Sequence, residues 1–328
     1  MNRRANYVVF VIAMMVMVAI IAGLSLAIAN REWIYDYFRG VSYEPAGEMA
    51  RIREDLQLTD RGRFVFNAAQ PVLSGRDSFN STCRSAVDTE VAVLGCYTGG
   101  NIYIYNIDSA ELKGIRELTT AHELLHAVWA RMSDEEKSNL RSVLEQVYSN
   151  NDDILKEELD TYTEAERLEE LYVRAGTEIA DLPDALEKHY ADVFSNQDLI
   201  VGYYNSYITV FKEIEAEMDA LKQEMDGISA QVELKKAEYE YRINQLNSEI
   251  DSFNECANTL GCFATESDFY ARRGILLAEQ DSVDAIYDEI NVLIDEYNEK
   301  VREYNADVTR GEQLNQMINS NAKVEEIK

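Results

Sequence analysis

Two stretches in the C-terminal third of the chain repeat apolar residues at alternating steps of three and four. The first seam consists of Phe211, Ile214, Met218, Leu221, Met225, Ile228, Val232, Tyr239, Leu246 and Phe253. The second consists of Leu276, Val283, Ile286, Ile290, Leu293, Tyr297, Val301, Tyr304 and Val308. Each seam requires a helix that buries a narrow stripe against another helix. Because only a short break at 254–266 separates them, we predict an antiparallel coiled-coil hairpin over 208–318 and a tail at 319–328.

The N-terminus carries an unbroken apolar run from Tyr7 to Ala29, long enough to cross a hydrocarbon core of roughly 30 Å as a helix. Arg3 and Arg4 precede it, which predicts a single-pass anchor in the cell membrane over 1–30, with the N-terminus cytoplasmic and the rest outside. The alternative is a cleaved signal peptide ending near Ala29, but the apolar run is longer than the usual 7–15 residues. Residues 31–61, with Trp33, Tyr35, Tyr37 and Phe38 near their start, are predicted to form a juxtamembrane stalk.

Net charge and composition limit the possible partners and the fold class of the chain. The net charge of −29 argues against a nucleic-acid partner, because phosphates would be repelled. Only 3 prolines and 15 glycines among 328 residues favour a mainly helical protein. We therefore predict an α+β chain that is mainly α, with a small sheet in the region 62–207.

Four cysteines form two close couples. Three pairings are possible, and the short spacings favour Cys83 with Cys96 and Cys256 with Cys262, the second as a staple at the tip of the hairpin. An exported compartment permits both bonds. A zinc site built from these cysteines is the alternative, although neither couple has a C-x₂-C spacing.

The strongest chemical signal is His122-Glu123-Leu124-Leu125-His126. On a helix, the two histidines lie one turn apart on the same face, where both imidazoles reach a single Zn²⁺. Glu123 adjoins the first histidine, the position from which a carboxylate accepts a proton from the attacking water in metallopeptidases of this spacing. The pattern predicts a zinc metallopeptidase domain over 62–207.

This motif, preceded by the strand-like segment Asn101–Ile107, resembles the zincin metallopeptidases. The resemblance implies that an edge strand near the zinc pairs with the extended substrate backbone, and we expect residues 101–107 to be that strand. The metzincin branch would require Gly and His where the chain has Trp129 and Met132, so the resemblance is to the gluzincins.

A gluzincin takes its third zinc ligand from a glutamate on a second helix. Glu170, in Glu170-Leu171-Tyr172-Val173, resembles that position, and the other candidates are Glu166, Glu169, Glu178 and His189. A glutamate that is not a ligand is expected to orient one of the ligating histidines. The same resemblance implies a Tyr or His that stabilises the oxyanion, and Tyr162 is the nearest candidate.

The resemblance implies a membrane-anchored, extracytoplasmic, zinc-dependent endopeptidase acting on a protein or peptide, or an amidase acting on a peptide-bearing polymer. The hairpin suggests a spacer, a surface for an envelope protein partner, or self-association. The alternative comes from a different class: a non-catalytic envelope scaffold that acts through its coiled coil, with zinc structural or absent.

Overall fold

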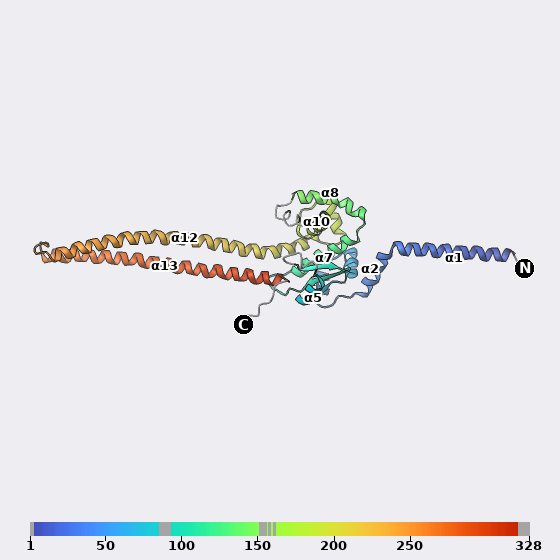
Figure 1. Cartoon of the computed structure of the whole chain (residues 1–328), viewed down its shortest axis with the longest axis horizontal. Coiled ribbons are helices and arrows are strands. Elements are labelled where there is room, and N and C mark those ends of the chain that lie inside the picture. The colour runs from blue at the N-terminus through green and yellow to red at the C-terminus, as the bar shows by residue number, and fades with distance from the viewer. Residues whose placement is uncertain (1–2, 85–92, 151–155, 157–158, 160–161, 321–328) are drawn as a thin grey trace. The chain divides into compact units, whose positions relative to one another are not determined.

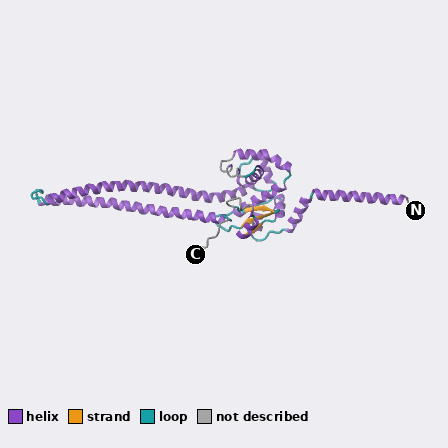
Figure 2. Cartoon of the chain, viewed as in Figure 1, coloured by secondary structure: helices purple, strands orange, loops and turns teal. Residues whose placement is uncertain are grey.

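The computed structural model describes residues 3–84, 93–150, 156, 159 and 162–320. It divides into two compact units, one made of residues 1–210 with 315–328 and the other of residues 211–314. Helices dominate, and the described strands form one small sheet, which confirms the predicted mainly helical chain (Figure 2). Most of the predicted tail, residues 321–328, lies outside the described residues.

The chain begins with helix α1, Arg3–Ala29, which covers the apolar run (Figure 1). Among the described residues, no single helix combines the length and hydropathy expected of a membrane span. Met14–Leu26 and Arg31–Ser42 meet that criterion only together, with a bend of 70° between them.

Residues 31–61 differ from the predicted stalk because they pack into the first unit. They form α2 (Arg31–Ser42), α3 (Glu48–Asp55) and the start of α4 (Asp60–Ala69). Met49, Ile52 and Leu56 are buried in the main hydrophobic core. The prediction relied on the high polarity of this segment and overlooked these three apolar side chains, which share one face at helical spacing.

The sheet has three strands, β1 (Val72–Ser74), β2 (Gly95–Thr98) and β3 (Asn101–Tyr105), in the order β1-β3-β2. β3 pairs in parallel with β1 and antiparallel with β2, so both of its edges are occupied. The expectation that residues 101–107 form the edge strand is therefore wrong. β1 and β2 occupy the two edges of the described sheet, one on each side of β3.

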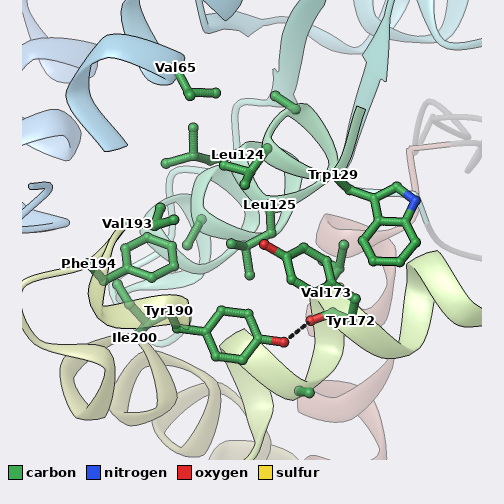
Figure 3. Packing of buried hydrophobic residues seen from close by; sticks show 14 of the residues in the cluster. Val65, Leu124, Leu125, Trp129, Tyr172, Val173, Tyr190, Val193, Phe194 and Ile200 are labelled. Carbon is green, nitrogen blue, oxygen red and sulfur yellow. Dashed lines mark hydrogen bonds between the residues drawn. The ribbon is translucent and has the colours of Figure 1, made fainter. Parts of the chain in front are cut away.

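The described part of the first unit holds further helices, besides the start of α12 and the end of α13. They are α5 (Arg76–Thr82), α7 (Ile115–Arg131), α8 (Asp134–Asn150), α10 (Glu164–Glu178) and α11 (Asp184–Ala191). α10 packs on α7 through a shared core in which Leu124 and Leu125 lie near Tyr172 and Tyr190 (Figure 3). The Tyr190 hydroxyl donates to the Tyr172 carbonyl oxygen at 2.6 Å, so this buried phenol is satisfied.

The second unit contains most of α12 (Gln197–Ala257) and α13 (Glu266–Ile318). Ion pairs cross between the two helices in antiparallel order, from Lys300–Glu224 through Lys235–Glu289 to Arg242–Glu279. The predicted seam positions are buried or half-buried, except Tyr297, which is 36% exposed.

Both predicted disulfides are present, Cys83–Cys96 and Cys256–Cys262. The alternative of a zinc site made from cysteines is thereby excluded, because no cysteine of the chain is free. Cys83 directly follows α5 and Cys96 lies in β2, so the first bond ties the edge strand to the preceding helix.

Candidate metal centre

Helix α7 presents both motif histidines on one face while its other face is buried. Leu124, Leu125 and Val128 pack into the core, which fixes the rotation of the helix about its axis. The imidazole rings of His122 and His126 lie 5.1 Å apart between centroids. The helix starts after Gly114, whose φ of +92° is costly for other residues and whose missing side chain leaves room for the Tyr203 ring.

Glu170 reaches the histidines from α10. A capping box between Thr163 and Glu166 starts this helix, and the buried Leu171 and Tyr172 orient it. The Glu170 carboxylate lies 3.8 Å from Nε2 of His122 and 3.5 Å from Nε2 of His126. The three residues offer ligand atoms that all lie within 4.8 Å of one another, a group that suits a metal ion.

Two neighbours hold this group in position. Glu169 Oε1 forms a hydrogen bond with Nδ1 of His126 at 2.9 Å. This bond fixes the imidazole ring and leaves Nε2 facing the centre. Arg174, one helical turn after Glu170, donates from Nε to Glu170 Oε1 at 2.8 Å. The expected orienting carboxylate is therefore Glu169, whereas Arg174 was not anticipated, although its spacing of four residues from Glu170 is visible in the sequence.

The remaining third-ligand candidates lie outside the group of His122, His126 and Glu170. Glu166 accepts hydrogen bonds from the backbone and the hydroxyl of Thr163 as part of the capping box. Nε2 of His189 lies 3.0 Å from the Tyr172 hydroxyl, and His189 does not belong to the described group that could hold a metal ion. Glu178 lines a cavity beside the centre and is likewise outside the group.

The electrostatics of the centre favour a bound cation. Burial lowers the pKa of His122 to about 4, against the attraction of Glu170. Burial also opposes the charge on His126, but hydrogen bonds to Glu169 and Glu170 raise its pKa to about 10. Glu170 is held ionised, since the neighbouring histidines and Arg174 outweigh its burial and keep its pKa far below the usual range. A bound metal ion would supply the positive charge that the proton on His126 supplies next to these carboxylates.

Glu123 is 6% exposed, and its side chain extends from α7 to the backbone of β2. A Cβ atom added at Gly95 would stand 2.6 Å from both Cγ and Oε1 of Glu123, and 2.8 Å from Cγ2 of Thr119. Glycine is thus the residue that lets the edge strand approach this carboxylate so closely. No pattern in the sequence marked Gly95, because the contact joins segments that only the fold brings together.

Two cavities open on the centre and share His122, Glu123 and Glu170. The larger, 340 Å³, also includes His126, Tyr97 and Tyr162 in its lining, so the nominated tyrosine lies in the same cavity as the metal group. The smaller, 190 Å³, extends past Leu118, Thr119 and Arg174 to Tyr204 and Tyr207. Space for a ligand therefore exists on two sides of the histidines.

Comparisons with known proteins identify no relative. No family model matches the chain, and neither a curated protein nor a solved structure matches it.

Proposed function

We propose that the chain is a membrane-anchored zinc metallopeptidase that hydrolyses peptide bonds on the extracytoplasmic side. The observation that carries the proposal is the convergence of His122, His126 and Glu170 beside the buried carboxylate of Glu123. Structural metal sites enclose their ion with four protein ligands, whereas a group of three leaves a position for water. The cavity of 340 Å³ next to the group supports a site that takes a substrate.

Two imidazoles and one carboxylate form a donor set that fits zinc. When bound, zinc supplies a strong Lewis acid and an activated water near neutral pH. Glu169 holds His126 in the tautomer whose Nε2 faces the ion, and Arg174 orients the carboxylate of Glu170.

The other residues of the centre take roles that follow from their positions. Glu123, in contact distance of the edge strand, is the general base that accepts a proton from the attacking water and passes it to the leaving amine. Tyr162, in the wall of the larger cavity, donates a hydrogen bond from its hydroxyl to the developing oxyanion.

In the described sheet β2 pairs only with β3, and its outer edge offers backbone groups to an extended peptide. The N–H of Tyr105 donates to the carbonyl of Leu94 at 2.8 Å, in register with the pair Gly95 and Ile104. Because antiparallel pairs alternate, Leu94 and Cys96 direct their backbone groups to β3, while Gly95 and Tyr97 direct theirs outward. A substrate strand is proposed to bond to these outward groups, which lie above Glu123.

The proposal includes two parts outside the centre. The apolar helix α1 anchors the chain as a single pass with its N-terminus cytoplasmic. The residues 211–314 form an antiparallel coiled coil, supported by the core of Ile228, Val232, Ile286 and Ile290, and dock to an envelope protein or a second copy.

The decisive experiment combines metal analysis with peptide hydrolysis in Glu123→Gln. The proposal predicts about one zinc per chain in both proteins and loss of hydrolysis in the variant, by about 10²-fold or more. Glu213→Gln, an exposed glutamate of α12, serves as the matched control and keeps full activity. Unchanged hydrolysis in Glu123→Gln with full zinc would exclude the role given to Glu123.

The alternative is a non-catalytic scaffold, favoured by the length of the two paired helices. It predicts that Glu123→Gln has no effect, whereas Leu221→Pro abolishes function, because proline in a helix interior costs about 3 kcal/mol or more. Purified protein that binds no zinc after reconstitution would favour the scaffold over the peptidase.

A further inference from the structure

We propose that the exposed face of helix α2 lies in the interfacial layer of a zwitterionic lipid bilayer, with the helix axis along the membrane plane. The proposal rests on the proposed membrane anchor and is independent of the peptidase activity. It assigns a binding partner, a lipid surface, to one face of a helix whose other face is docked on the metal-binding unit.

The docked face of α2 is polar. The Asp36 carboxylate accepts two bonds from Arg131, the last residue of α7, at 2.7 and 3.0 Å. Arg39 donates to the carbonyl oxygens of Ala68 and Gly100 at 2.9 and 3.1 Å and to the side chain of Asn101. These contacts fix the rotation of α2 about its axis.

The outward face of α2 is apolar and aromatic. Trp33, Tyr37 and Val41 follow one another at single-turn spacing, and Phe38 adjoins them around the helix. Their exposed fractions are 59%, 46%, 70% and 68% in the order Trp33, Tyr37, Val41, Phe38. The Trp33 ring stacks on Tyr37 with 5.5 Å between centroids, so the rings form one continuous patch.

This arrangement reverses the usual one, in which an amphipathic helix buries its apolar face and exposes its polar face. Here the polar face is committed to the protein, whereas the apolar face stays largely exposed among the described residues, although the Trp33 ring also stacks on Phe64 at 6.4 Å between centroids. A contiguous aromatic patch of this kind indicates an interaction surface.

Three observations identify the occupant as lipid. Only Asn30 separates α2 from α1, whose described side chains from Met14 to Leu26 include apolar residues more than half exposed. Trp and Tyr are the residues enriched where a protein crosses the membrane surface, because each has an apolar body and a polar tip. The net charge of −29 disfavours anionic lipid, which selects a zwitterionic surface.

Tryptophan fluorescence tests the proposal directly, because the chain has only 2 tryptophans and Trp129 is 5% exposed. The full-length Trp129→Phe variant, reconstituted in phosphatidylcholine vesicles, leaves Trp33 as the reporter. Acyl chains brominated near the headgroup are expected to quench its emission at least twofold, whereas aqueous iodide leaves it nearly unchanged. In the matched Trp33→Phe variant, the buried Trp129 should respond to neither quencher.

Other outcomes identify other occupants. Quenching by iodide alone would overturn the proposal and leave the patch in water. Protection from both quenchers would also overturn it and indicate a protein partner, including a second copy of the chain. Phe38→Glu, placed within the patch, should shift Trp33 from bromine towards iodide quenching. If the chain stays in the vesicle fraction while Trp33 escapes bromine quenching, the anchor holds and only the α2 assignment fails.

Discussion

Substitution of Gly95 by alanine adds one methyl group at the point where the edge strand meets the proposed base. The new Cβ atom would lie 2.6 Å from Cγ and Oε1 of Glu123. Carbon atoms in contact normally stand about 3.5–4.0 Å apart, so roughly 1 Å of separation is missing. Because the Glu123 side chain is buried against β2, either its carboxylate or the strand must move.

Both movements have measurable consequences. Overpacking of this kind costs about 1–3 kcal/mol, which denaturant unfolding of Gly95→Ala will detect. A displacement of about 1 Å at the base is expected to lower kcat for a peptide substrate by roughly 10²-fold. Zinc content should stay near that of the unaltered protein, because the atoms nearest to the added methyl group belong to Glu123 and Thr119 and not to a proposed ligand.

The control is Gly202→Ala, where an added Cβ meets nothing within 4 Å. This helical position should gain about 0.5–1 kcal/mol of stability and keep full activity. If Gly95→Ala keeps both the stability and the kcat of the unaltered protein, the inferred contact between β2 and Glu123 does not constrain the base. A parallel loss of zinc would instead assign the strand to metal binding.

Three further predictions concern the supports of the centre. Glu169→Gln should weaken zinc binding 10–100-fold in a metal titration, whereas Glu166→Gln, in the same cavity wall, should leave the affinity unchanged; equal affinities for the two variants would remove the orienting role. Asp36→Asn breaks a largely buried charged hydrogen bond and should lower the free energy of unfolding by about 1.5–3 kcal/mol; a smaller loss in denaturant unfolding would show that α2 is held mainly by other contacts. The joint replacement of Cys83 and Cys96 by serine opens a loop with a sequence separation of 13, worth about 3 kcal/mol by chain entropy; an unchanged unfolding midpoint would refute this estimate of the bond's contribution.

The sequence predicted those features that depend on local spacing. The histidines at i and i+4 need only a helix to share a face, and Glu170 stands at the start of a short apolar run that orients α10. The cysteine pairings followed from proximity along the chain. Each of these predictions used interactions within one element or between near neighbours.

The features that were missed depend on how distant segments meet. β2 is only four residues long and, within the described sheet, pairs with β3 alone, so its sequence pattern is weak. β3 was taken for the edge because nothing local shows that β1 adds to its other side. The contact of Gly95 with Glu123 joins positions 28 residues apart in the sequence, and glycine carries no side chain whose pattern would reveal it.

The ion pair between Asp36 and Arg131 limits how far the candidate metal centre can stand from α2. Arg131 lies five residues after His126 on α7, an axial rise of about 7.5 Å. If α2 lies at the bilayer surface as proposed, the Asp36–Arg131 pair would keep the candidate metal centre close to the lipid headgroups. With the proposed peptidase activity, a centre held in this way would cleave a segment of a neighbouring protein just outside the membrane and would spare the same sequence farther from the bilayer.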